Sequence, residues 1–277
     1  MDILLENGAA GAGVCEVGAL RPFMTRRMSE RMAALPFEPL CAIVGSFPFF
    51  TGEDNPSGAA RGGMIAQFAR AADYHMAVFR RVSAAAGAMS AAFQGARFHP
   101  LKNGWPLPIV EAARLAGVAF TGRHGLAIDG TYGSYIALSA VLCDSRLPLS
   151  QPLGYCNGCD GAPACESACP TGAISRDGER RVFDRERCIS HITQNSDSAR
   201  LETLRLTPYI WGCDICQQAC PHNQNVPKTP LPEFLENVIS RVRPSGLGGP
   251  SMPTDRHYSD RLHLLERNMR YTGDGNE

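Results

Sequence analysis

Eight of the eleven cysteines gather in one stretch of the chain, and their spacing is that of iron–sulfur ligands. Two runs each end in Cys-x3-Cys-Pro, and each run also contains a C-x2-C pair. In proteins with two clusters, a C-x2-C turn offers two thiolates to one cluster, while the cysteine before proline reaches the other. Eight thiolates fill two clusters of four ligands without remainder. The pattern therefore predicts two [4Fe–4S] clusters.

The same logic predicts how the thiolates divide between the clusters. Cluster I is expected to bind Cys156, Cys159, Cys165 and Cys220. Cluster II is expected to bind Cys169, Cys188, Cys213 and Cys216. Five residues separate Cys159 from Cys165 where the usual run has two, so residues 160–164 are expected to form a loop insertion. Zinc is the alternative, because C-x2-C pairs also build zinc ribbons, but zinc gives no reason for two Cys-x3-Cys-Pro endings.

The composition is that of a folded protein with no bulk charge. Lys and Arg total 27 and Asp and Glu total 27, so the net charge is zero, which argues against nucleic-acid binding through bulk charge. Apolar residues make up 44% of the chain, too many for disorder, yet no apolar stretch is long enough to span a membrane. The N-terminus lacks the basic region of a secretory signal, so we expect a cytoplasmic protein whose clustered cysteines serve metal or redox chemistry.

The elements that position the cysteines divide the chain into three parts, residues 1–150, 151–226 and 227–277. The first part is expected to be a mixed α/β domain, and its cysteines Cys15, Cys41 and Cys143 are expected to be buried packing residues. Continuous apolar runs predict strands at 41–47, 125–128 and 135–142, and helical spacing predicts helices over 65–93, 108–115, 232–242 and 259–268. The first of these helices is either continuous or broken near Gly87, and the tail from Thr272 is expected to be loose.

Several segments resemble the epoxyqueuosine reductases, cobalamin- and iron–sulfur-dependent enzymes of queuosine biosynthesis. The cysteine-rich stretches that carry the resemblance include Cys-Pro-Thr-Gly-Ala-Ile-Ser at 169–175 and Trp-Gly-Cys-Asp-Ile-Cys-Gln-Gln-Ala-Cys-Pro at 211–221. Upstream, residues 68–75 resemble the family's YARGxDYH segment, 108–113 and 122–124 its APVLE and GKN segments, and 132–135 its YGSW. Together these motifs cover residues 40–225 in order.

The resemblance implies an α+β protein. A mixed α/β cobalamin-binding domain, similar to that of reductive dehalogenases, would be followed by a ferredoxin-like double [4Fe–4S] domain. Electrons would pass from an external ferredoxin- or flavodoxin-type donor through cluster II and then cluster I to cobalt. The protein is expected to be a monomer. The resemblance places Ser190 beside the corrin and the backbones of Ala127 and Leu138 in the same pocket. His75 is either a corrin contact or a hydrogen-bonded histidine at a helix–domain interface.

Three departures from the family concern the substrate. The family has an aspartate as proton donor where this chain has Trp105, and an indole closes a pocket or stacks on a planar molecule rather than donating a proton. His99, His124 or Tyr135 would then supply the proton, or the reaction differs. Only residues 222–277 follow Pro221, too few for the helical repeats of longer members, so a short form is expected. The zero net charge also speaks against tRNA.

Three functions therefore remain open. The first is a cobalamin-dependent reductase whose substrate is not tRNA. The second is epoxyqueuosine reduction in tRNA by a short form of the enzyme. The third is a two-cluster electron-transfer protein without substrate chemistry of its own.

Overall fold

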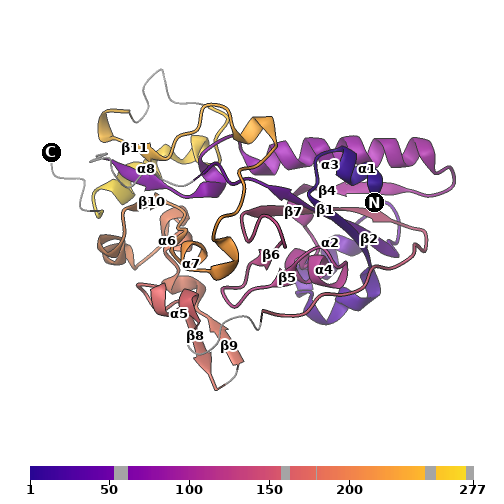
Figure 1. Ribbon diagram of the computed structural model, residues 1–277, viewed down its shortest axis with the longest axis horizontal. Coiled ribbons are helices and arrows are strands. Elements are labelled where there is room, and N and C mark those ends of the chain that lie inside the picture. The colour runs from indigo at the N-terminus through magenta and orange to yellow at the C-terminus, as the bar shows by residue number, and fades with distance from the viewer. Residues whose placement is uncertain (53–61, 157–162, 179, 247–253, 273–277) are drawn as a thin grey trace. The chain divides into compact units, whose positions relative to one another are not determined.

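The structure is a computed structural model that describes residues 1–52, 62–156, 163–178, 180–246 and 254–272 (Figure 1). The chain forms two compact units. The first consists of Met1–Phe49 and Tyr74–Cys156, and the second of Phe50–Asp73 and Asn157–Glu277. These bounds differ from the three parts of the sequence because residues 50–73 pack with the cysteine-rich half of the chain.

A four-stranded antiparallel sheet forms the centre of the first unit. Its strand order is β1 (Gly11–Glu16), β2 (Cys41–Pro48), β7 (Ile136–Cys143) and β4 (Phe98–Leu101). Every residue of β2 is buried, and so is every residue of β7 except Leu138, which explains why both strands are continuous apolar runs. The strands predicted at 41–47 and 135–142 are thus confirmed.

Helices accompany this sheet in the first unit. They are α1 (Asp2–Glu6), α2 (Arg26–Ala33), α3 (Tyr74–Ala92) and α4 (Ile109–Leu115), with 3₁₀ turns at Val17–Phe23 and Lys102–Gly104. A small hairpin of β5 (Phe120–Thr121) and β6 (Ala127–Ile128) follows α4. The helix predicted at 108–115 is confirmed, and the strand predicted at 125–128 is reduced to its last two residues.

The prediction of one helical pattern over 65–93 is wrong at its start. Ile65 ends a strand and Phe68 lies in a 3₁₀ turn, so the helix begins only at Tyr74. Apolar residues at three- and four-residue spacing upstream of Tyr74 serve the core of the second unit instead. The helix runs through Gly87 without a break, because the alanines around this glycine favour the helix.

The second unit is built around a three-stranded sheet. Its central strand, β3 (Gly63–Ile65), pairs in parallel with β10 (Tyr209–Trp211) and antiparallel with β11 (Arg241–Val242). A separate hairpin consists of β8 (Ile174–Asp177) and β9 (Arg180–Phe183). The helices are α5 (Ala164–Ala168), α6 (Ile189–Gln194), α7 (Ile215–Gln218) and α8 (Leu262–Met269), and 3₁₀ turns occur at Gln67–Ala69, Arg185–Arg187, Leu201–Leu206, Pro221–Asn223, Pro232–Phe234, Pro244–Gly246 and Ser259–Arg261.

Two predictions for the end of the chain have opposite outcomes. The helix expected at 259–268 is confirmed by a 3₁₀ turn that leads into α8. The helix expected at 232–242 is wrong, because its last residues form β11 and pair with β3, far away in the sequence. The loose tail predicted from Thr272 falls mainly outside the described residues.

The cores agree with the α+β class predicted from the sequence. Cys15, Cys41 and Cys143 are all buried, as predicted, and Cys41 lies directly opposite Cys143 in the sheet. In the second unit, the fully buried side chains of Trp211 and Tyr258 pack around β3 and α8. Within the part of the chain that is described, none of the helices combines the length and apolar character needed to cross a membrane.

Candidate functional site

Four cysteines that the sequence assigns to cluster II are electrostatic neighbours in the second unit. Burial raises the pKa of Cys213, and the nearby thiols of Cys216 and Cys188 raise it further. Burial likewise raises the pKa of Cys216 to about 12, with contributions from Cys188 and Cys169. The structure therefore brings together cysteines that are far apart in sequence. Burial disfavours ionisation of Cys188, Cys213 and Cys216, and a metal cluster would displace their protons on binding.

Backbone amides donate to the sulfur atoms of Cys188 and Cys169. Cys188 is the N-cap of α6, whose first N–H groups have no partner within the helix, and its sulfur accepts from Ser190 and His191. At Cys169 burial opposes ionisation, but hydrogen bonds from Thr171 and nearby backbone amides outweigh it and lower the pKa. Amide donors of this kind stabilise thiolates and the sulfur atoms of bound clusters.

The cysteines assigned to cluster I lie in different parts of the chain, and each is described in turn. Cys156 ends the first unit, where its amide donates to the carbonyl of Thr121 over 2.8 Å. Cys165 on α5 and Cys220 after α7 are both buried in the second unit, and Cys165 contributes to the raised pKa of Cys216 after burial and other nearby groups. Cys159 lies outside the described residues, and so do residues 160–162 of the predicted loop insertion.

A fully buried carboxylate, Asp214, stands between two of these cysteines and was not predicted from the sequence. Its Oδ2 accepts from the backbone amide of Gln67 over 2.8 Å, and its Oδ1 accepts from Nε2 of Gln217 over 3.1 Å. The side chain of Gln67 is in turn held by Thr51, whose hydroxyl and amide both donate to Oε1. An acidic residue within a C-x2-C pair was the signal that could have revealed it.

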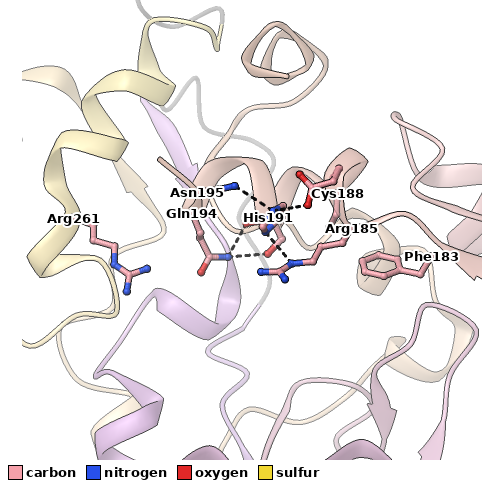
Figure 2. Close-up of a pocket in the computed structure, with 9 residues that line it drawn as sticks. Phe183, Arg185, Cys188, His191, Gln194, Asn195 and Arg261 are labelled. Atoms are coloured by element: carbon pink, nitrogen blue, oxygen red, sulfur yellow. Dashed lines mark hydrogen bonds and ion pairs between the residues drawn. The ribbon is translucent and has the colours of Figure 1, made fainter. Parts of the chain in front are cut away.

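A pocket of about 640 Å³ opens beside Cys188 in the second unit (Figure 2). Ser190, predicted to lie next to the corrin, is one of its lining residues. Gln194 donates to the hydroxyl of Ser190 over 3.0 Å, and Arg185 Nε donates to His191 Nδ1 over 3.2 Å. The lining as a whole is polar and consists of Phe183, Arg185, Glu186, Cys188, Ser190, His191, Gln194, Asn195 and Arg261.

The other residues that the resemblance assigns to the corrin lie in the first unit. His75 is half-buried at the start of α3, with its ring centroid 4.0 Å from that of Tyr74. Ala127 is buried in β6, and Leu138 is the one half-buried residue of β7.

The residue at the family's acid position is a partly exposed tryptophan. Trp105 is 41% exposed, and the guanidinium of Arg27 lies 5.6 Å from its ring centre. The indole N–H donates hydrogen bonds but is too weakly acidic to give up its proton. Trp105 therefore offers a stacking surface and not a proton.

The three candidate replacements for the acid differ in their surroundings. His99 is half-buried in β4, and Tyr135 is buried with its ring edge against Phe49. His124 is buried, and its Nδ1 accepts from the amide of Leu126 over 3.1 Å. In this bond Nδ1 serves as an acceptor and not as a proton donor.

The first unit also carries polar atoms suited to an amide-rich ligand such as cobalamin. Thr121 Oγ1 and Arg123 Nε, at and beside the β5–β6 hairpin, are buried and have no hydrogen-bond partner among the described residues. Buried donors without partners are costly, and a bound ligand removes the cost. The corrin periphery carries carbonyl acceptors on its amide side chains. The donors present therefore fit such a cofactor.

Comparisons with known proteins agree with the cysteine pattern. Residues 155–223 match the 4Fe-4S double cluster binding domain. The epoxyqueuosine reductase of Escherichia coli is 33% identical over 249 residues, which cover 85% of this chain and 60% of that protein. The chain therefore spans less than two thirds of the length of this relative.

Solved structures extend the likeness to the fold. The epoxyqueuosine reductase of Streptococcus thermophilus superposes with a TM-score of 0.77 at 21% identity, over 96% of this chain and 78% of that one. A catabolic reductive dehalogenase matches with a TM-score of 0.52 at 19% identity, over 80% of this chain and 31% of that one. The chain is thus related in sequence to epoxyqueuosine reductases, and the predicted likeness to reductive dehalogenases is confirmed for the fold.

Proposed function

We propose that this protein is an oxidoreductase that uses two [4Fe–4S] clusters and cobalamin to reduce a substrate other than tRNA. The observation that carries the proposal is the grouping of Cys169, Cys188, Cys213 and Cys216 in one unit. Kinship with epoxyqueuosine reductases and the double-cluster domain support it. Electrons would enter from a ferredoxin- or flavodoxin-type donor at cluster II and leave through cluster I.

The proposal keeps the ligand sets predicted from the spacing. Cluster II is held by the four grouped cysteines, and the amides at the start of α6 support its thiolate at Cys188. Cluster I is held by Cys156, Cys159, Cys165 and Cys220.

Cobalamin, when bound, would supply a strongly reducing metal centre for the substrate. The chain would contribute Ser190 and the polar lining around it, together with the backbones of Ala127 and Leu138. Gln194 holds the hydroxyl of Ser190, so this contact is already oriented. His75 remains a candidate contact on α3.

The surroundings of Trp105 favour a substrate other than tRNA epoxyqueuosine. The indole does not replace the family's acid, and Nδ1 of His124 is occupied as an acceptor. An exposed indole suits a planar substrate that stacks on it. Reduction of epoxyqueuosine in tRNA is the second candidate, favoured by the kinship alone. A carrier without substrate chemistry is the third, and the loss of the acid favours it.

Anaerobic reconstitution tests the proposal. We expect about eight irons per chain, the number that two [4Fe–4S] clusters hold, together with one tightly bound cobalamin seen by absorbance and EPR. Binding of iron without cobalamin would contradict the proposal and favour the electron-transfer protein. Binding of zinc in place of iron would overturn the proposal. Complementation of a strain that lacks epoxyqueuosine reductase, scored by queuosine in tRNA, separates the first two candidates.

A further inference from the structure

The side chain of Asn268 on α8 is fully buried beside the two segments that lead to Cys188 and Cys213. It is 0% exposed, and α8 packs against α6 and β10 (Figure 1). Cys188 is the N-cap of α6, and β10 ends two residues before Cys213. The match to the double cluster binding domain ends at residue 223, so α8 lies outside that domain.

The amide of Asn268 joins these two segments. Its Nδ2 donates to the carbonyl of Thr193 in α6 over 2.8 Å and to the carbonyl of Ile210 in β10 over 2.7 Å. Its Oδ1 accepts from Nε and Nη2 of Arg267, which also donates to the carbonyl of Asn195 at the C-cap of α6 over 2.7 Å. Carbonyls only accept and a guanidinium only donates, so these partners fix which way the amide points. Both N–H donors of the amide are thus used to hold α6 against β10.

The buried hydroxyl of Thr193 makes a second link, close to Cys213. It accepts from the backbone amide of Gly212 over 3.0 Å and donates to the carbonyl of Ser190 over 3.0 Å. Gly212 directly precedes Cys213 in the sequence. The segment that leads into Cys213 is therefore tied to the helix that Cys188 caps.

We propose that Asn268 is a positioning residue for cluster II, and that α8 is thereby part of the site of this cluster. The inference rests on the proposed function, since it requires the cluster. Cys188 and Cys213 come from distant segments, and their thiolates bind one cluster only when the chain holds them at the spacing of the cluster. Side chains that orient metal ligands contribute to metal affinity without touching the metal. Asn268 orients both ligands through the backbones of α6 and β10.

The coupling between α8 and cluster II is reciprocal. Binding of the cluster fixes Cys188 and Cys213, so it also stabilises the arrangement of α6 and β10 on which α8 packs. Local openings of α8 should therefore become rarer when cluster II is bound. Amide hydrogen exchange measures such openings.

The test is Asn268→Leu in the full reconstituted chain. Leucine is of similar size but donates no hydrogen bond, so the carbonyls of Thr193 and Ile210 lose their donor. We expect an iron chelator to remove cluster II about 10- to 100-fold faster than from the parent protein, with cluster I released at the parental rate. EPR identifies the cluster that is lost, because Cys188→Ala should retain cluster I alone.

Val242→Ala is the matched control. Val242 is buried in the same unit and belongs to the core on which α8 packs, but it makes no bond to Asn268. This variant should lower thermal stability and release cluster II at the parental rate. Thr193→Val keeps nearly the same shape and removes the hydroxyl bonds to Gly212 and Ser190, so it should release cluster II faster, as Asn268→Leu does.

Hydrogen exchange supplies a readout that a loss of stability alone would not change. Loading of the parent protein with iron and sulfide should slow exchange in α8. Cys188→Ala and Asn268→Leu should not show this slowing, the first because it lacks cluster II and the second because the link is cut.

Four results would overturn the inference. One is equal release of cluster II from Asn268→Leu and Val242→Ala. Another is equally faster loss of both clusters from Asn268→Leu. The third is exchange in α8 that does not change when the parent protein is loaded. The fourth is failure of both Asn268→Leu and Thr193→Val to fold, which would leave the network a role in folding alone. Failure of the parent protein to bind iron would instead contradict the proposed function.

Discussion

Cys188 depends more than any other predicted ligand on distant parts of the chain. It has no cysteine partner close in sequence, yet it lies near Cys169, Cys213 and Cys216. Its position as N-cap of α6 places two backbone amides on its sulfur. A ligand so placed joins the helix, the hairpin region and the second cysteine run into one site.

Removal of this thiolate gives the first prediction. Cys188→Ala should leave about four of eight irons, because a [4Fe–4S] cluster needs its fourth ligand, while cluster I keeps its own set. Iron and sulfide counting after reconstitution measures this. Cys143→Ser is the control, since Cys143 is buried in β7 and should cost only ~1–3 kcal/mol of stability. Loss of iron from that control would show that the ligand assignment is wrong.

Cys15 gives a pH-dependent prediction. Burial, and then the nearby thiol of Cys41, raise the pKa of Cys15 from 9.0 to about 12. The unfolded chain therefore loses this proton at a lower pH than the folded chain. Stability from this group is complete below pH 9 and is lost as the pH rises towards 12, with a slope of up to ~1.4 kcal/mol per pH unit.

Urea denaturation at several pH values under reducing conditions checks this slope. Cys15→Ala should flatten the stability profile between pH 9 and 11 relative to the parent protein. Parallel profiles for the two proteins would contradict a raised pKa at this thiol.

At the scale of elements, two glycines differ in the space around them: Gly63 lies where strands approach closely, and Gly87 lies on an open helix face. A Cβ on Gly63 in β3 would overlap the Ile210 side chain, at 2.2 Å from its Cγ2. A Cβ on Gly87 in α3 would meet nothing within 4 Å. Packing therefore requires glycine at position 63 but not at position 87, and alanine substitutions should have opposite effects on stability at the two positions.

Gly63→Ala should destabilise the protein by ~1–3 kcal/mol, because Ile210 must move within a packed sheet. Gly87→Ala should stabilise it by ~0.5–1 kcal/mol, because alanine favours the helix. Chemical denaturation measures both free energies of unfolding. Equal effects of the two substitutions would mean that β3 does not pack against β10 as described.

Helix α4 holds the segment that leads to Cys156. Arg114 pairs with Glu111 on the same helix, donates to the carbonyl of Leu153 over 2.9 Å and lies 4.8 Å over the ring of Tyr155. These contacts end one residue before the first predicted ligand. The hydrogen bond that Arg114 donates to Glu111 outweighs the opposing effect of burial and raises the pKa of Arg114, so the guanidinium stays charged.

Arg114→Ala should therefore destabilise the first unit by ~1–3 kcal/mol, since Glu111 and the carbonyl of Leu153 lose their donor. Arg205→Ala is the control, because Arg205 pairs with Glu202 in full exposure and such pairs contribute less than about 1 kcal/mol. Thermal denaturation of both variants compares them. Similar losses in the two would show that the contacts of Arg114 do not hold the segment.

Sequence patterns predicted the long strands that are buried along nearly their whole length. They failed for a short strand that forms only by pairing with a segment far away in the sequence. The strands around Ile43 and Val141 were predictable because every position except Leu138 is buried. β11 was not, since two residues become a strand only through pairing with Met64 and Gly63. Among site residues, the cysteines follow a local spacing rule. The structural role of Asp214 depends on a hydrogen bond from Gln67, which is remote in sequence.

For the whole molecule, the second unit is assembled from two separate stretches. Residues 50–73 supply β3, the central strand of its sheet, and Gln67, which contacts Asp214. A fragment of residues 151–277 keeps all eight predicted ligands but lacks both. We expect this fragment to show less secondary structure by circular dichroism and to retain fewer irons than the full chain. A fragment that holds eight irons would contradict the role of β3.

The central position of β3 has a consequence for how the protein is made. During translation β3 leaves the ribosome long before β10 and β11, its two neighbours in the finished sheet. β3 therefore lacks its two partner strands while residues 74–156 of the first unit are synthesised. Iron–sulfur assembly machinery would therefore meet a complete site only near the end of synthesis. For the same reason, we expect a cysteine-rich segment moved into another protein to need residues 50–73 as well.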